Sequence, residues 1–214
     1  MQCFKNSQGK PVVDAMIGTI QKNKDYLAEI DGLIGDGDHG HNMNKGFSMC
    51  AGRLAADASL QESLDLLGNV LFAEIGGSMG PIYGTIFMEM ADAIAGAEDI
   101  CAGQFAAMLD AAVNGLEAII EAKVGDKTIM DTLVPARDRF KAAVEAGTGF
   151  ADALTVMVEA AEQGKNSTID LVAKHGRSSR LGERSKGVLD AGATSCFLLL
   201  QAMAGAAKSL LSPA

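Results

Sequence analysis

Apolar residues recur every three or four positions along most of this chain, and that spacing places them on one face of an α-helix. The clearest run lies within residues 10–29, at Val12, Val13, Met16, Ile17, Ile20 and Leu27. No stretch alternates apolar and polar residues with the β-branched enrichment that is typical of strands. We therefore expect an all-α protein without a sheet.

This periodicity predicts eight or nine helices. Their approximate ranges are 10–29, 41–55, 59–75, 81–95, 103–123, 128–145, 150–164, 167–175 and 191–210. Pro81 suits the first turn of its helix, where an N–H group would have no helical partner. We find no internal repeat, low-complexity tract or linker, so we expect a single helical domain over residues 1–214.

Charge and hydropathy exclude several classes of partner. The net charge of −9 and the pI near 4.8 argue against nucleic acid or an anionic membrane as the main partner. The longest apolar stretch, residues 196–207, is interrupted by Gln201 and is too short to span a bilayer. The N-terminus lacks the basic and apolar regions of a secretory signal. We expect a soluble, cytoplasmic protein.

The four cysteines, Cys3, Cys50, Cys101 and Cys196, are widely spaced and form no C-x-x-C pair. Hydrophobic residues make up 48% of the chain, which is enough to build a core without disulfide bonds. We therefore predict that all four cysteines are buried, reduced thiols.

Three carboxylates and three glycines lie within the eight residues from Asp31 to Asp38, with no Lys or Arg among them. Two unit charges about 4 Å apart repel by about 4 kcal/mol at an effective dielectric constant near 20. A divalent cation relieves that repulsion, and oxygen ligands without Cys suit Mg²⁺ better than zinc. We predict that Asp31, Asp36 and Asp38 bind Mg²⁺, and a solvated acidic turn is the alternative.

Three familiar nucleotide or metal motifs do not fit this segment. The G-x-G-x-x-G pattern at residues 35–40 follows a predicted helix, whereas the dinucleotide fingerprint follows a strand. An EF-hand loop counted from Asp36 has His41 in place of its glycine and Phe47 in place of its glutamate. The chain contains no Walker A sequence. A nucleotide site here would belong to another class.

Two helix starts suit an anion, because free backbone N–H groups and the helix dipole favour negative charge there. The helix after the acidic turn opens with His39, Gly40, His41 and Asn42. The run from Gly76 to Pro81 brings bare N–H groups and the Ser78 hydroxyl to another helix start. A tight turn between two helices would explain this second run equally well.

Two other glycine-rich breaks leave alternatives open. The run at residues 125–128, Gly-Asp-Lys-Thr, is explained by helix capping through Asp126. Residues 176–187 are the only strongly basic stretch, and arginines flanked by glycines suit phosphate binding. A solvated loop would account for that stretch equally well.

Together these four glycine-rich segments between the predicted helices resemble the signatures of DhaL, the nucleotide-binding L subunit family of dihydroxyacetone kinases. The matching runs are Gly35-Asp36-Gly37-Asp38-His39-Gly40-x-Asn42-Met43, Gly76-Gly77-Ser78-Met79-Gly80-Pro81-x-Tyr83-Gly84-Thr85, Gly125-Asp126-Lys127-Thr128 and Gly176-Arg177-x-Ser179-x-Leu181-Gly182-Glu183-Arg184-Ser185. The match is ordered and covers about residues 10–210. It implies an antiparallel eight-helix barrel with a nucleotide site at one end.

The resemblance also implies the ligands and the residues that hold them. Two Mg²⁺ ions would be coordinated by Asp31, Asp36 and Asp38, together with ADP or ATP. The nucleotide would contact His39, Gly40, His41, Asn42, Ser78, Met79, Ile120, Ile129, Arg177, Asp190, Ala191 and Gly192. In this family the sugar is held covalently by a separate K subunit. We therefore expect no catalytic residue on this chain beyond those that position metal and phosphate.

On this resemblance the chain is the ADP/ATP-binding subunit of a dihydroxyacetone kinase that acts on dihydroxyacetone or a related small ketose. In the phosphotransferase version an M subunit recharges the bound ADP. An ATP-dependent L subunit, a nucleotide-bound regulatory module and the nucleotide domain of a fatty-acid kinase are the alternatives. Near the expected pocket, the residues that depart from the usual family pattern are Met79, Val188, Leu189 and Ala191, which leaves the phosphodonor open. A homodimer is also left open.

Overall fold

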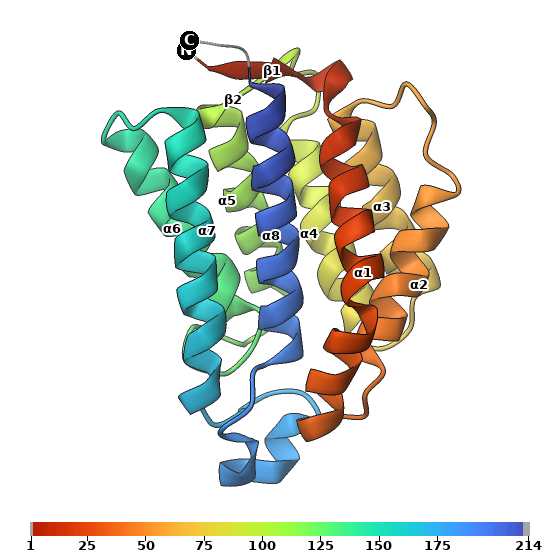
Figure 1. Cartoon of the computed structure of the whole chain (residues 1–214), viewed down its shortest axis with the longest axis vertical. Helices are drawn as coiled ribbons and strands as arrows, with labels where there is room; N and C mark the ends of the chain where they lie inside the picture. The colour runs from red at the N-terminus through yellow and green to blue at the C-terminus, as the bar shows by residue number, and fades with distance from the viewer. Residues whose placement is uncertain (1, 212–214) are drawn as a thin grey trace.

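Eight α-helices make up most of residues 2–211, the part of the chain that the computed structural model describes (Figure 1). Their bounds are α1 (Lys10–Ile34), α2 (His39–Ala51), α3 (Leu60–Glu74), α4 (Met79–Ala93), α5 (Ala102–Ile119), α6 (Met130–Glu145), α7 (Phe150–Ser167) and α8 (Ala191–Leu210). The all-α prediction is confirmed. Among the described helices, none has both the length and the apolar character needed to cross a lipid bilayer.

The helix predicted at residues 167–175 is wrong. Only the short 3-10 helix η2 (Thr168–Asp170) forms there. The hydroxyl groups of Ser167 and Thr168 each donate to a backbone carbonyl three residues earlier. Such local side-chain bonds compete with the regular helical pattern, and α7 ends at this point.

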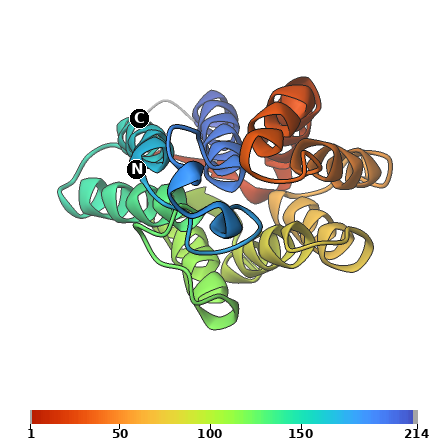
Figure 2. The same ribbon diagram turned by 90° about the horizontal axis from the view of Figure 1, so that it is seen from below.

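The helices form a closed antiparallel ring. Each helix contacts the next one in the chain, and α8 returns to contact α1. All connections but the one between α7 and α8 are short, and such connections make consecutive helices antiparallel, so alternate connections lie at the same end of the ring. Figure 2 shows the segment between α7 and α8, which contains η3 (Ser178–Ser185), lying across the lower end.

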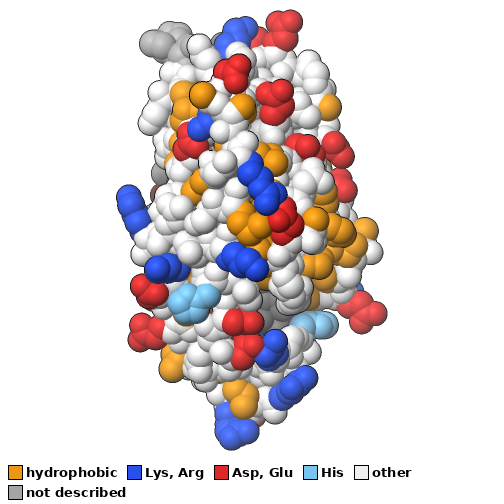
Figure 3. All heavy atoms as spheres, turned by 90° about the vertical axis from the view of Figure 1, so that its right-hand side faces the viewer, with side chains coloured by type: hydrophobic (Ala, Val, Ile, Leu, Met, Phe, Trp, Pro, Cys, Tyr) orange, Lys and Arg blue, Asp and Glu red, His pale blue; other side chains and the backbone are white. Residues whose placement is uncertain are grey.

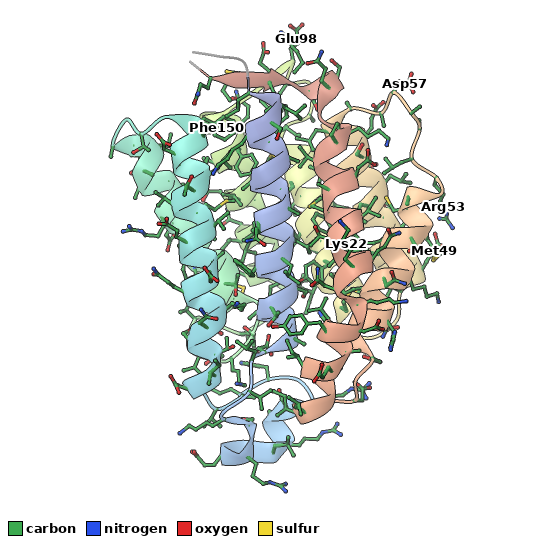
Figure 4. The ribbon with its side chains drawn as sticks, in the orientation of Figure 1. Lys22, Met49, Arg53, Asp57, Glu98 and Phe150 are labelled. Carbon is green, nitrogen blue, oxygen red and sulfur yellow. A yellow bond between two sulfur atoms is a disulfide. The ribbon has the colours of Figure 1, made fainter. Side chains whose placement is uncertain are left out.

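Aliphatic, methionine and phenylalanine side chains fill the ring. On α3, Leu60, Leu64 and Leu67 are fully buried at helical spacing, as the sequence predicts. The rings of Phe140 and Phe150 pack at a centroid distance of 6.0 Å near the upper end, where Figure 4 labels Phe150. Apolar side chains therefore pack the ring as far as its upper end.

A small antiparallel strand pair departs from the expectation that a sheet is absent. β1 (Cys3–Lys5) pairs with β2 (Asp99–Cys101), and Cys3 lies opposite Cys101. Strands of three residues are too short to show an alternating pattern in the sequence. The expectation is therefore wrong at this one place.

The same strand pair overturns part of the cysteine prediction. Cys3 and Cys101 form a disulfide bond, so they are not reduced thiols. Cys50 and Cys196 are free and buried, as predicted. The two bonded cysteines are 98 positions apart, and only the pairing of β1 with β2 brings them together.

Removing this disulfide with Cys101→Ser is expected to lower the free energy of unfolding by about 2 kcal/mol, because the bond closes a long loop in the unfolded chain. The loss stays in the lower part of the usual range because backbone pairing and the buried Phe4 also hold β1. Thermal unfolding with and without dithiothreitol tests this. The reductant should lower the melting temperature of the wild type and leave that of Cys101→Ser unchanged. A wild-type melting temperature that does not change with the reductant would contradict the prediction.

Candidate functional site

A cavity of about 500 Å³ opens at the lower end of the ring. Its walls come from the α1–α2, α3–α4 and α5–α6 connections and from the segment between α7 and α8. Figure 3 shows charged side chains of both signs on the lower part of one face, at this end of the molecule. The volume is typical of a site for a small molecule.

The three predicted metal ligands lie together in the cavity wall. Asp31 is on the last turn of α1, Asp36 lies in the connection, and Asp38 precedes α2. Each offers a carboxylate oxygen within 4.8 Å of the other two. Burial, followed by the charges of Asp36 and Asp31, raises the pKa of Asp38. A donor set made of carboxylate oxygens alone fits a hard divalent cation such as Mg²⁺.

Arg177 brings a positive charge to this acidic cluster. Its guanidinium group pairs with the carboxylate of Asp36, and the residue lies in the cavity wall. The basic segment therefore faces the acidic turn, although 62% of the Arg177 side chain remains exposed. Guanidinium groups bind carboxylates and phosphates with the same fork of N–H donors. Arg177 is thus suited to an anionic ligand in the cavity.

The start of α2 contributes two of the four residues predicted there. His39 and Asn42 line the cavity, whereas His41 is exposed and does not. Gly40 is buried against α1, and a Cβ atom at this position would lie 1.9 Å from the carbonyl oxygen of Lys24. Glycine at this position permits the close crossing of α1 and α2.

A hydrogen-bond network behind the carboxylates holds His39. Its Nε2 atom lies 2.8 Å from the Oγ atom of Ser195, which in turn lies 2.6 Å from the Tyr83 hydroxyl oxygen. Burial lowers the pKa of His39 to about 4, so the ring is neutral at neutral pH. Sequence reasoning assigned no role to Tyr83 or Ser195. Tyr83 lies within a glycine-rich motif, but a serine in the second turn of α8 carries no signal.

The other predicted contacts all lie in the cavity wall. They are Ser78, Met79, Ile120, Ile129, Asp190, Ala191 and Gly192. Ile120 and Ile129 come from the two ends of the α5–α6 connection and, with Ile34 and Ile82, give the cavity an apolar lining. The cavity therefore suits a ligand that has an anionic part, able to share a cation, and a flat, less polar part.

The turn at residues 125–128 is not capped in the predicted way. Asp126 accepts the N–H of Lys123 and pairs with Lys174 at 2.6 Å, a contact that lowers the pKa of Asp126 to about 2. Asp131, in the first turn of α6, instead accepts the N–H groups at both ends of the turn. The capping prediction is wrong because a carboxylate inside the helix reaches back to the turn.

Comparison with known proteins identifies the family. Residues 33–205 match the family model described as the DAK2 domain. This chain belongs to the DAK2 domain family. It is 37% identical over 186 residues to the ADP-binding subunit DhaL of the PEP-dependent dihydroxyacetone kinase of Escherichia coli strain K12, covering 86% of this chain and 89% of that one. The predicted resemblance to DhaL is confirmed.

Other DAK2 relatives agree. The ADP-binding subunit DhaL of PEP-dependent dihydroxyacetone kinase 2 of Listeria innocua is 35% identical over 204 residues, with 88% of this chain and 89% of that one covered. The solved dihydroxyacetone kinase of C. freundii matches with a TM-score of 0.67 at 22% identity in its native form, and with 0.67 at 20% in complex with AMP-PNP and Mg²⁺. This chain spans 35% and 34% of those two chains, so they support the fold alone.

Two groups in the DAK2 pocket are expected to affect stability with opposite dependence on pH. Burial raises the pKa of Asp190 from 3.8 to about 6, so its stabilising contribution is complete below the lower value and is lost as the pH rises through the upper one. Burial lowers the pKa of His39 from 6.5 to about 4, so its contribution is complete above 6.5 and is lost as the pH falls through 4. The two effects oppose each other across nearly the same range.

Chemical denaturation in EDTA at several pH values between these limits measures both effects. Relative to the wild type, Asp190→Asn should gain stability more steeply as the pH rises, because only the His39 effect remains. His39→Gln should show the opposite difference. If the plots of unfolding free energy against pH for both variants run parallel to that of the wild type, neither group titrates in this way.

Proposed function

We infer that this chain is the nucleotide-binding subunit of a dihydroxyacetone kinase, which passes a phosphoryl group to dihydroxyacetone or a related small ketose. The observation that carries this inference is the cavity itself, where three carboxylates within 4.8 Å of one another share the wall with Arg177 and apolar side chains. The Escherichia coli and Listeria innocua relatives are named as ADP-binding subunits of such kinases, which supports the same ligand here.

Each part of the cavity suits one part of a magnesium nucleotide. We propose that Asp31, Asp36 and Asp38 hold two Mg²⁺ ions, which when bound supply positive charge to the phosphates. The phosphates would be contacted by His39, Asn42, Ser78, Met79 and Arg177, and the base and sugar by Ile120, Ile129 and the Asp190–Gly192 turn. These side chains bind and orient the nucleotide, and the apolar ones keep water from it.

The chain's own serine–histidine pair does not provide a nucleophile. Ser195 lies beside His39 but is fully buried, and its hydroxyl group also contacts Tyr83 and the carbonyl of Gly192. Phosphoryl transfer depends mainly on positioning and charge neutralisation, which this cavity can provide. The acceptor therefore comes from elsewhere, and we propose a K subunit that carries the ketose.

We further propose that a phosphotransferase M subunit regenerates the bound nucleotide. The supporting observation is that the two DhaL relatives reported above are named as subunits of PEP-dependent kinases. In that arrangement the nucleotide stays on this subunit as a carrier of the phosphoryl group. An ATP-dependent arrangement would instead exchange the nucleotide in every turnover.

Reconstitution tests the proposed function. The chain is mixed with a K subunit and dihydroxyacetone, and then either with ATP or with phosphoenolpyruvate and the phosphotransferase proteins. Formation of dihydroxyacetone phosphate is expected in the second arm with only a catalytic amount of ADP, and Asp36→Asn should abolish it. Asp57→Asn, an exposed change in the α2–α3 connection at the other end of the molecule, is the control and should remain active (Figure 4). No product in either arm would leave a regulatory module as the function.

A further inference from the structure

Lys127 is a buried lysine whose position none of the roles above explains. Its side chain belongs to a residue that is 1% exposed, and its backbone has a φ of 61°, in the left-handed region that favours glycine. Its Nζ atom donates to the carbonyl oxygens of Thr168 and Val188. A buried ammonium group in an unusual backbone conformation is costly to form, so the contacts that it makes must hold it there.

The two carbonyls that Lys127 joins lie at opposite ends of one segment. Thr168 follows directly after α7, and Val188 lies just before α8. Next to Lys127, the N–H of Gly187 donates to the carbonyl of Ile169 at 2.8 Å. The N–H of Asp190 donates to the Thr168 hydroxyl at 3.0 Å. Residues 168–190 thus form a loop with its two ends side by side, and Lys127 ties these ends to the α5–α6 connection.

The charges around Lys127 fit this role. Burial lowers its pKa, whereas the nearby carboxylates of Asp190, Asp131 and Asp170 act in the opposite direction. Beside it, Asp126 holds the loop a second time through the ion pair with Lys174. The Gly-Asp-Lys-Thr turn therefore supplies one buried contact and one surface contact to the same loop.

The loop carries part of the cavity wall. His175, Gly176, Arg177 and Ser178 line the cavity from this loop, and Arg177 contacts Asp36 across it. The outer part of the loop is much more exposed, at Arg180, Glu183, Arg184 and Lys186. In this outer part the backbone hydrogen bonds are local, from Arg180 to Arg177 and from Lys186 to Glu183. The loop is held further in, where the N–H of Ala173 donates to the buried Ser185 hydroxyl and Lys174 pairs with Asp126, and at its two ends. The placement of Arg177 therefore depends on how firmly these inner contacts and the ends of the loop are held.

We propose that Lys127 is a positioning residue, which fixes both ends of the 168–190 loop and so holds Arg177 in the wall of the nucleotide pocket. The proposal rests on the proposed function only for the identity of the ligand. A methionine at this position has a similar length but leaves both carbonyls without their donor. The loop should then open while the helical ring stays closed.

Limited trypsin digestion of Lys127→Met is the first test. The loop offers cleavage sites after Arg177, Arg180, Arg184 and Lys186, all of them exposed. Cleavage at these sites should be about tenfold faster than in the wild type, since proteolysis follows the population of the opened state. Lys22→Met, an exposed change on α1 labelled in Figure 4, is the matched control and should behave as the wild type. If cleavage within the helices accelerates as much as cleavage in the loop, Lys127 supports the whole fold instead, and the proposal is overturned.

Ligand binding gives a second readout that a purely structural role would not produce. Dissociation of a fluorescent ADP analogue from Lys127→Met should be faster by about tenfold or more, because small misplacements of a positioning group have large effects. Binding of Mn²⁺ alone to the three aspartates should not weaken, because Arg177 no longer competes for Asp36. Nucleotide dissociation at the wild-type rate, or a parallel loss of Mn²⁺ binding, would overturn the proposal.

Hydrogen–deuterium exchange of the wild type decides the question if Lys127→Met does not fold. The amides of Gly187 and Asp190, at the ends of the loop, should exchange at least about tenfold more slowly than those at the exposed tip. Equal exchange at both places would show that the ends are not held. Failure of the proposed function would instead appear as a wild type that binds no ADP, and it would leave the digestion and exchange results unaffected.

Discussion

Asp38→Asn is expected to weaken the binding of Mg·ADP by at least about 100-fold, since even groups that merely support a metal ligand contribute 10- to 100-fold to metal affinity. Asp38 shares the site with Asp31 and Asp36, and their carboxylate oxygens lie within 4.8 Å of one another. An amide keeps one oxygen and the size of the side chain but removes the negative charge that a hard cation requires.

The same substitution should not reduce the stability of the metal-free protein. Burial and the two neighbouring carboxylates raise the pKa of Asp38, which means that its negative charge is less stable in the folded, metal-free protein than in the unfolded chain. Removing that charge relieves the repulsion, and the melting temperature in EDTA should stay the same or rise.

Isothermal titration with Mg·ADP and thermal unfolding in EDTA, carried out on the same preparations, measure the two effects. Asp57→Asn removes an exposed carboxylate far from the cavity and should change neither quantity. Wild-type affinity in Asp38→Asn would rule out the metal site. A large loss of stability in EDTA would show that Asp38 serves the fold.

Gly40→Ala is expected to destabilise the protein by about 3 kcal/mol or more, beyond the usual range for an added methyl group in a packed core. The new Cβ atom would lie 1.9 Å from the carbonyl oxygen of Lys24 and 2.7 Å from the amide nitrogen of Ala28. Both atoms belong to the backbone of α1, so no side-chain rotation relieves the overlap. The two helices must move apart, and His39 and Asn42 would move with α2.

Gly18→Ala provides the matched control. Gly18 also lies within a helix, on α1, but a Cβ atom there meets nothing within 4 Å. Alanine should therefore stabilise the helix by up to about 1 kcal/mol through its better helix propensity. If the close crossing of α1 and α2 causes the loss in Gly40→Ala, urea denaturation should show a lower free energy of unfolding for Gly40→Ala and a higher one for Gly18→Ala. Equal changes in the free energy of unfolding at the two positions would exclude the close crossing as the cause.

Much of the fold follows from local patterns in the sequence. The spacing of Leu60, Leu64 and Leu67 identifies α3 without any tertiary knowledge, because helical periodicity depends on neighbours three and four positions away. The eight helices lie within a few residues of their predicted ranges for the same reason. The false helix at 167–175 arises where hydroxyl groups bond to the backbone, a competition that apolar spacing does not reveal.

The candidate site was predictable where its residues are close in sequence. Asp31, Asp36 and Asp38 lie within eight positions, so their repulsion and their suitability for a cation are visible before folding. The wider list of contacts came from the resemblance to DhaL and not from spacing. Ile120, Ile129 and Arg177 from that list line the same cavity as the aspartates, and their roles toward a nucleotide stay proposals.

The sequence by itself determined the helices and the acidic turn, because both depend on residues that are near one another in the chain. Closure of the ring decided the rest, since it places connections from four parts of the chain at one end. Only that arrangement brings Arg177 to Asp36, Lys127 to the ends of the 168–190 loop, and Cys3 to Cys101. Such contacts depend on distances in space, which no local pattern of residues encodes.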